Sequence, residues 1–105
     1  MERLEGDSAI ISLAAEEGIT PGAYIVRRIK LAQHFHRSRI DTSHSYVVIG
    51  INSEGLKVYG SKAHIEEAKE LLDHQEEINR GLVAARTGTV PTEYRITSMN
   101  GDILY

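Results

Sequence analysis

The chain has 105 residues, 41% of them hydrophobic and 26% charged, and its formal net charge is -3 at pH 7. This composition is ordinary for a folded globular protein, and the length suits one domain with a single modest core. The lack of cysteine excludes disulfides, thiol nucleophiles and cysteine-based metal sites, and no apolar run approaches the roughly 20 residues that span a bilayer.

The first expected element follows an acidic start, since residues 1–20 carry a formal charge of -4. The apolar run Ala9–Leu13 is short enough to fit either a strand or a helix with its N-cap at Asp7. Gly18 suits the position just after a helix end. A signal peptide has a basic start and a longer apolar core, so we expect a cytoplasmic protein with no membrane partner.

A helix is predicted from Thr20 to about His36. Thr20 is a good N-cap, and Pro21 fits the first helical position, where its missing N–H is not needed. At 100° per residue, one side of this helix is apolar and is expected to face the core. The residues of this apolar side are Tyr24, Ile25, Ile29, Ala32 and Phe35.

The same helix gathers positive charge, because residues 21–45 carry a formal charge of +4 in an acidic chain. Arg27, Lys30, His34 and Arg37 recur at spacings of 3, 4 and 3, which places them within an arc of about 80°. Such a stripe can neutralise phosphates. A solvated face that balances the acidic remainder explains it equally well. We take these four residues, with Arg39 at the edge, as candidate nucleic-acid contacts.

A β-hairpin is expected next, because "SYVVIGI" and "LKVYG" are strand-like and flank the turn sequence "NSEG". Ser61 is predicted to cap a third helix that Gly81 ends. Its apolar residues would form a stripe able to cover a sheet: Ile65, Ala68, Leu71, Leu72, Ile78 and Leu82. The tail "EYRITSMNGDILY" predicts a second hairpin, with Asn100–Gly101 in a type I′ turn.

The glycines of "GITPG" lie just before the N-terminus of the second helix, where free N–H groups and the helix dipole favour an anion. Gly18, Thr20 and Gly22 are therefore candidate backbone donors to phosphate. A helix C-cap followed by a tight connection explains the same glycines, and we prefer that explanation.

No metal, cofactor or catalytic site is expected. His34 and His36 point about 200° apart on a helix, and Asp41 would join His44 only through tertiary folding. No serine lies in a recognisable nucleophile motif, so we expect a protein that is not an enzyme.

The order of helix, glycine loop, basic helix, strand, turn, strand and helix resembles type I KH domains. "YVVIGINSEGLKVYGSKAHIEEAKELL" (residues 46–72) is similar to the second half of such a domain. The resemblance covers residues 8–75 of the single domain 1–105, and residues 76–105 add the helix end and a C-terminal hairpin. It implies a first strand at Ala9–Leu13 and RNA binding beside Gly18–Gly22. That loop is one residue longer than the family's GxxG and holds no basic residue, which also suits a protein-interaction role.

A second resemblance covers "IISLAAEEGITPGAYIVRRI" (residues 10–29), which is similar to a helix-turn-helix unit. Its second helix would lie in the major groove of DNA. One expected apolar position falls on Arg27, so the turn would need an extra residue.

These observations together predict an α+β domain, with three helices packed on an antiparallel sheet of three to five strands. The expected function is nucleic-acid binding, RNA or single-stranded nucleic acid before duplex DNA, through the basic face of the second helix. The alternatives are a protein-interaction or small regulatory domain that docks an acidic protein surface, and a helix-turn-helix regulator. The acidic partner could be the N-terminal segment of a second copy, and a homodimer through an edge strand is a further expectation.

Overall fold

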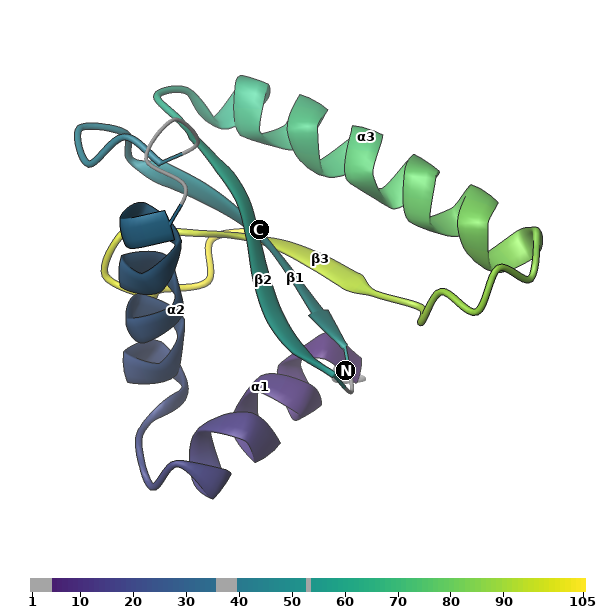
Figure 1. The fold of residues 1–105 in the computed structure, drawn as a ribbon. Helices are drawn as coiled ribbons and strands as arrows, with labels where there is room; N and C mark the ends of the chain where they lie inside the picture. Colours follow the sequence, from purple (N-terminus) through teal and green to yellow (C-terminus); the bar gives the residue numbers. More distant parts are fainter. Residues whose placement is uncertain (1–4, 36–39, 53) are drawn as a thin grey trace.

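An antiparallel sheet of three strands forms the centre of the fold, and three helices pack on it (Figure 1). The computed structural model describes residues 5–35, 40–52 and 54–105. The elements in chain order are α1 (Glu5–Glu16), α2 (Pro21–Phe35), β1 (Tyr46–Asn52), β2 (Gly55–Lys62), α3 (Ile65–Ala84) and β3 (Glu93–Thr97). The strand order is β2-β1-β3. The expected α+β fold with three helices and an antiparallel sheet is confirmed.

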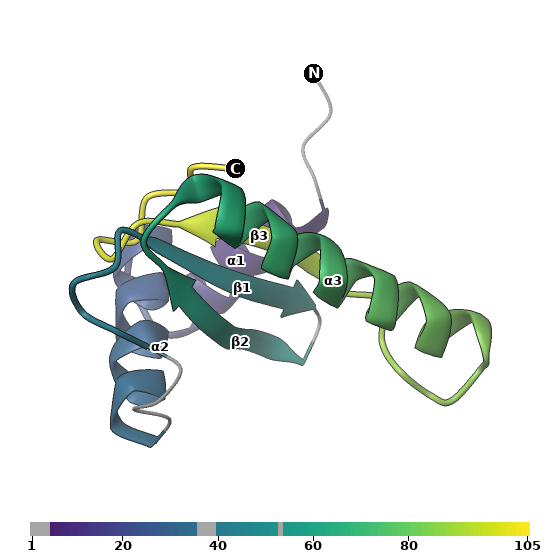
Figure 2. The ribbon, with the colours of Figure 1, turned by 90° about the horizontal axis from the view of Figure 1, so that it is seen from above.

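The central strand β1 divides the core into two parts, because successive side chains of a strand point to opposite faces of the sheet. Val47, Ile49 and Ile51 pack with buried residues of α1 and α2. Val48 packs on the other face with Ala68 and Leu72 of α3 and with residues of β3. The sheet is therefore the middle of three layers, with α1 and α2 on one side and α3 on the other (Figure 2).

The predicted first hairpin is confirmed as β1 and β2, which pair along their length. Val48 pairs with Gly60 and Ile49 pairs with Val58, so Tyr59 has no partner on β1 and forms a β-bulge. Val58 and Tyr59 point to opposite faces, as neighbouring residues of a strand do: Val58 lies in the α1–α2 core, and Tyr59 packs against the α3 core.

The segment Ala9–Leu13 lies within helix α1, so the helix alternative is confirmed and the first strand implied by the KH-like resemblance is not formed. The helix begins at Glu5, before the expected cap at Asp7. Its end is a Schellman motif, in which the Ile19 N–H donates to Ala14 O and the Gly18 N–H donates to Ala15 O. Gly18 has a φ of 70°, which a glycine adopts without steric strain.

The predicted second helix is confirmed as α2, and its start is the expected one. The Ala23 N–H donates to Thr20 Oγ1 at 3.2 Å, and Pro21 is the first helical residue. Tyr24, Ile25 and Ile29 are buried. Phe35 is 71% exposed, so its predicted core position is wrong. Phe35 lies only about 20° around the helix from the buried Tyr24, but about three turns further along it. It is the last residue of α2, so its exposure comes from its place at the helix end and not from its side of the helix.

Both boundaries predicted for the third helix are wrong. Ser61 is a buried residue of β2 rather than a helix cap, and His64 takes the N-cap position of α3 without a side-chain cap bond. The helix runs through Gly81 to Ala84. An internal glycine costs about 1 kcal/mol relative to alanine but does not have to end a helix. The chain leaves α3 at Arg86, which has a φ of 56°.

Helix α3 covers the sheet with its first half only. Ala68 and Leu72 are buried, but Ile78 and Leu82 are 44% and 42% exposed. Figure 2 shows the second half of α3 continuing past the ends of the strands. The predicted apolar stripe is thus formed, but its far half lies beyond the sheet. No helix within the described residues has the length and apolarity needed to cross a membrane.

The predicted C-terminal hairpin is formed in a short version. Thr97 bridges to Ile103, and the Leu104 N–H donates to Ile96 O at 2.8 Å. Arg86 is the only non-glycine with positive φ in the described ranges, so Asn100 does not form a type I′ turn, which needs two positive φ values. The C-terminal residues cover part of the outer edge of β3. The predicted homodimer through an edge strand stays a prediction.

Candidate functional site

The outer face of α2 carries the residues that the helical projection separates from the core. Ala23, Arg27, Lys30, Leu31 and His34 are exposed, and their spacing places them on one side of the helix. Arg37 and Arg39 lie outside the described residues. The structure therefore presents three of the predicted basic residues on one surface, and their role in binding stays a prediction.

Arg27 has a partner within the chain. Its guanidinium forms an ion pair with Glu17, which follows α1, and Arg28 Nη2 lies 3.8 Å from the second carboxylate oxygen of Glu17. Both side chains of the Arg27–Glu17 pair stay partly exposed, and such surface pairs contribute about 0–1 kcal/mol. Among the side chains that the structure describes, no carboxylate lies within ion-pair distance of Lys30 or His34. The stripe is thus neutralised in part, at Arg27.

A groove of about 520 Å³ lies along this face, between α2 and the turn before the C-terminal residues. Ala23, Val26 and Leu31 supply apolar lining, and the remaining lining residues are Arg27, Lys30 and Asn100. Leu31 is 43% exposed. The groove therefore combines an apolar floor with two cationic side chains.

The turn that carries Asn100 is held by its own hydrogen bonds. The hydroxyl of Ser98 accepts the N–H groups of Asn100 at 3.2 Å and Asp102 at 3.1 Å. Gly101 packs so closely on α2 that a Cβ there would collide with the carbonyl oxygen of Gly22. This contact joins residues far apart in the sequence, and sequence reasoning therefore missed Asn100 and the apolar floor.

The predicted phosphate loop at Gly18–Gly22 uses several of its polar groups within the chain. The N–H of Gly18 closes α1, and the hydroxyl of Thr20 caps α2. These bonds match the C-cap and tight connection that we preferred. A contribution of Gly18, Thr20 and Gly22 to anion binding stays a prediction, with fewer free donors than the sequence indicates.

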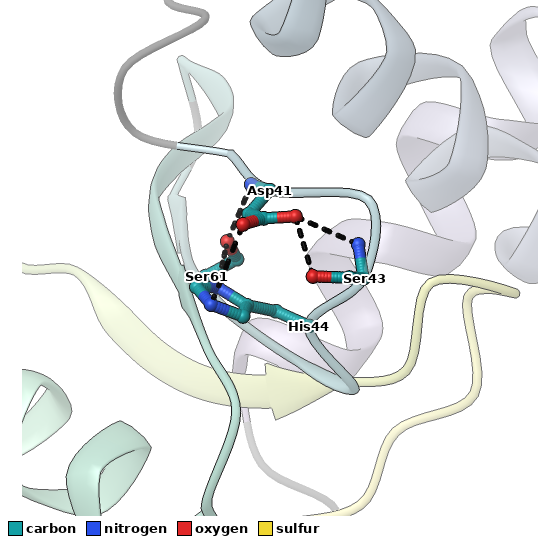
Figure 3. Close-up of polar contacts among 4 residues, drawn as sticks. All are labelled: Asp41, Ser43, His44 and Ser61. Carbon is teal, nitrogen blue, oxygen red and sulfur yellow. Dashed lines mark hydrogen bonds and ion pairs between the residues drawn. The ribbon is translucent and has the colours of Figure 1, made fainter.

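A second polar cluster joins the loop before β1 to the end of β2 (Figure 3). Ser61 Oγ accepts the Asp41 N–H at 2.8 Å and lies 2.9 Å from His44 Nδ1. His44 Nε2 lies 3.7 Å from Asp41 Oδ2. Asp41 Oδ1 also accepts the N–H and the hydroxyl of Ser43, at 2.8 and 2.7 Å. These hydrogen bonds hold the pKa of Asp41 below its usual value.

Serine, histidine and aspartate are the residue types of a serine hydrolase triad, but here the hydrogen bonds join the loop before β1 to β2, and the serine beside His44 is buried. Ser61 is 5% exposed, and its Oγ already accepts a backbone N–H, so it is poorly placed to attack a substrate. The fold does bring Asp41 and His44 together, a contact that the sequence alone did not predict. In the described part of the chain, no group of three or more histidine, aspartate or glutamate side chains is arranged to hold a metal ion.

Comparisons with known proteins identify no relative of this chain, so a function can be argued only from the geometry described above. No family model matches the chain, and neither a curated protein nor a solved structure is significantly similar to it.

Proposed function

We propose that this domain is a protein-binding module, rather than an enzyme, and that the outer face of α2 binds an acidic, amphipathic segment of a partner protein. The groove beside α2 carries the proposal. Its apolar lining from Ala23, Val26 and Leu31 lies next to Arg27 and Lys30. This is the pattern that an amphipathic helix with acidic flanks complements when it lies in a groove.

The apolar floor favours a protein segment over a nucleic-acid backbone. Burying the exposed part of Leu31 stabilises a complex with an apolar side chain, at about 25 cal/mol per Å² of apolar surface. Nucleic-acid backbone contacts depend instead on the number of phosphates that lysine and arginine neutralise. In the described part of the stripe, Arg27 already faces Glu17, which reduces that number.

Nucleic acid is the second candidate for the same surface, because Lys30 and His34 are exposed and without a carboxylate partner among the described residues. The ion pair of Arg27 is weak enough for a phosphate to replace Glu17. Single-stranded RNA and duplex DNA are therefore alternative ligands in the test.

The test measures fluorescence anisotropy of a labelled amphipathic peptide made of leucine, alanine and glutamate, with a scrambled peptide, single-stranded RNA and duplex DNA as further ligands. We expect the amphipathic peptide to bind, and Leu31→Asp to weaken it by about tenfold or more, which corresponds to about 1.4 kcal/mol. Ile11→Asp is the matched control, because Ile11 is 41% exposed on α1 and does not line the groove.

Two salt concentrations separate the candidates. Binding of the acidic peptide should weaken only moderately with salt, because salt screens its contacts with Arg27 and Lys30 but not its apolar contacts, whereas nucleic-acid binding weakens steeply. Strong, salt-sensitive binding of RNA or DNA that Lys30→Glu abolishes, without peptide binding, would overturn the proposal in favour of the second candidate. Equal binding of the amphipathic and scrambled peptides would overturn it as well.

A further inference from the structure

A second cavity lies on the opposite side of the sheet from α2 and is independent of the proposed protein-binding surface. Its volume is about 370 Å³, and it lies between the second half of α3, the segment that returns from α3 to β3, and the β1–β2 hairpin. Volumes of this order are typical of small-molecule sites, and the lining here combines apolar and aromatic side chains with amides, threonine hydroxyls and two charged residues.

One wall of the cavity is apolar and exposed. Ile78 and Leu82 both line it, and they are separated by one turn of α3. They are 44% and 42% exposed, although they continue the stripe that Ala68 and Leu72 bury against the sheet. Large apolar side chains that line a cavity without filling it leave apolar surface for a ligand to cover.

The opposite wall is aromatic and is built against a glycine. The rings of Tyr59 and Tyr94 lie with centroids 5.4 Å apart. A Cβ on Gly50 would lie 2.8 Å from Tyr59 Cε2 and 3.0 Å from Tyr94 Cε1, so only glycine lets both rings pack directly on the central strand. A glycine inside a strand marks a place where another group approaches closely. Here that group is a pair of rings that line the cavity.

Hydrogen bonds hold the cavity open. Asn79 of α3 accepts the Thr92 N–H at 3.1 Å and donates to Val90 O at 3.2 Å. Asn52 donates to Thr92 Oγ1 at 3.0 Å and accepts the Glu54 N–H at 2.8 Å. Both amides are therefore engaged by the chain itself, and they fix the walls rather than recognise a ligand.

The charges around the cavity do not favour an anion. Glu54 and Lys57 both line it, and the ammonium of Lys57 lies 5.4 Å from the centre of the Tyr59 ring. Burial raises the pKa of Tyr94, and the neighbouring Tyr59 and the carboxylate of Glu76 raise it further. Tyr94 thus stays a neutral phenol, and the site has no excess of positive charge.

We propose that this cavity binds a small, flat aromatic molecule that is neutral or carries a positive charge, with its ring between Ile78 and Leu82 on one side and Tyr59 and Tyr94 on the other. The apolar wall supplies contact area. The two tyrosine rings supply offset or edge-on aromatic contacts. Since Lys57 already lies over the Tyr59 ring, the Tyr94 ring is the one that would attract a cationic ligand.

The test uses three ligands that share one ring system: indole, which is neutral, tryptamine, which is a cation, and indole-3-acetate, which is an anion. The chain has no tryptophan, so energy transfer from tyrosine to the bound indole ring reports binding directly. We expect indole and tryptamine to bind more tightly than indole-3-acetate. Ile78→Ser and, separately, Leu82→Ser should weaken indole binding by about tenfold.

Ile11→Ser is the matched control, because Ile11 is also an exposed helical isoleucine and lies outside the cavity. It should leave the affinity for indole unchanged. The proposal is overturned if indole does not bind, if Ile78→Ser and Ile11→Ser bind it equally, or if indole-3-acetate binds the most tightly of the three. None of these outcomes depends on whether the α2 surface binds a peptide.

Discussion

The two faces of the sheet are covered to different extents. On one face, α1 and α2 together bury a continuous core that reaches from Ile10 to Val58. On the other face, a single helix of 20 residues buries Ala68 and Leu72, and its second half extends beyond the strands. A groove runs along the outside of α2 on the first side, and a cavity lies beside the half of α3 that extends beyond the strands on the second side. The sheet thus has one face that two helices cover along its length and one face that a single helix covers only in part.

The largest expected effect compares two isoleucines from these two faces. Ile49 is fully buried beneath α1 and α2, whereas Ile78 is 44% exposed on α3. Ile49→Ala should lower the free energy of unfolding by about 2–5 kcal/mol, because it leaves a cavity in the core. Ile78→Ala should change it by less than about 0.5 kcal/mol. Urea denaturation followed by circular dichroism measures both values, and equal losses would contradict the contrast between the faces.

A smaller effect compares two glycines with nearly the same backbone conformation. Gly101 has a φ of 86° and packs on Gly22 of α2, whereas Gly88 has a φ of 85° with no atom within 4 Å of its would-be Cβ. Gly88→Ala should cost about 1 kcal/mol from backbone strain alone. Gly101→Ala should cost at least about 2 kcal/mol, because a steric clash with α2 adds to that strain. Thermal denaturation of the two variants measures the difference, and identical values would show that the turn does not press on α2.

The ends of α1 and α3 provide a third comparison, because each ends in a Schellman motif with a residue of positive φ. The residue is Gly18 after α1 and Arg86 after α3. The Arg86 N–H donates to Val83 O, and the Thr87 N–H donates to Leu82 O. Arg86→Gly should raise the free energy of unfolding by about 1 kcal/mol, since glycine tolerates this conformation, and Gly18→Ala should lower it by a similar amount. A loss of stability in Arg86→Gly would contradict this account.

The smallest effect concerns the loop that leads from the α2 side into the sheet. The hydrogen bonds from Ser43 lower the pKa of Asp41 in the folded state from its ordinary value of 3.8. A carboxyl with a lowered folded pKa stabilises the fold above its unfolded pKa, and this stability is lost as the pH falls through the folded pKa. We therefore expect a small loss of stability on acidification below about pH 4. Asp41→Asn should remove that part of the pH dependence, and a pH titration of urea midpoints checks it.

Local signals predicted the elements whose boundaries depend on neighbouring residues. Thr20 and Pro21 marked the start of α2 correctly, and the β-branched runs marked the first hairpin. Ser61 misled the prediction because its partner is the backbone of Asp41, twenty residues earlier in the chain. Gly81 misled it because a glycine within a long helix weakens the helix without ending it.

The candidate site was predictable only in part for the same reason. Helical spacing alone separated Arg27, Lys30 and His34 from the buried stripe. The ion pair of Arg27 depends on the path of the chain around the end of α1, and the groove depends on Asn100, which reaches α2 from the other end of the sequence. The cavity under α3 depends on contacts among α3, the hairpin and β3, and no local pattern carries that information.

The most direct test of the two-sided account is one nuclear magnetic resonance titration of the isotope-labelled protein, first with the acidic amphipathic peptide and then with indole. The account predicts that the peptide shifts the amide signals of Ala23, Val26, Leu31 and Asn100, and that indole shifts those of Tyr59, Ile78, Leu82 and Tyr94. Peptide shifts centred on α3, indole shifts centred on α2, or the absence of shifts from both ligands would contradict it.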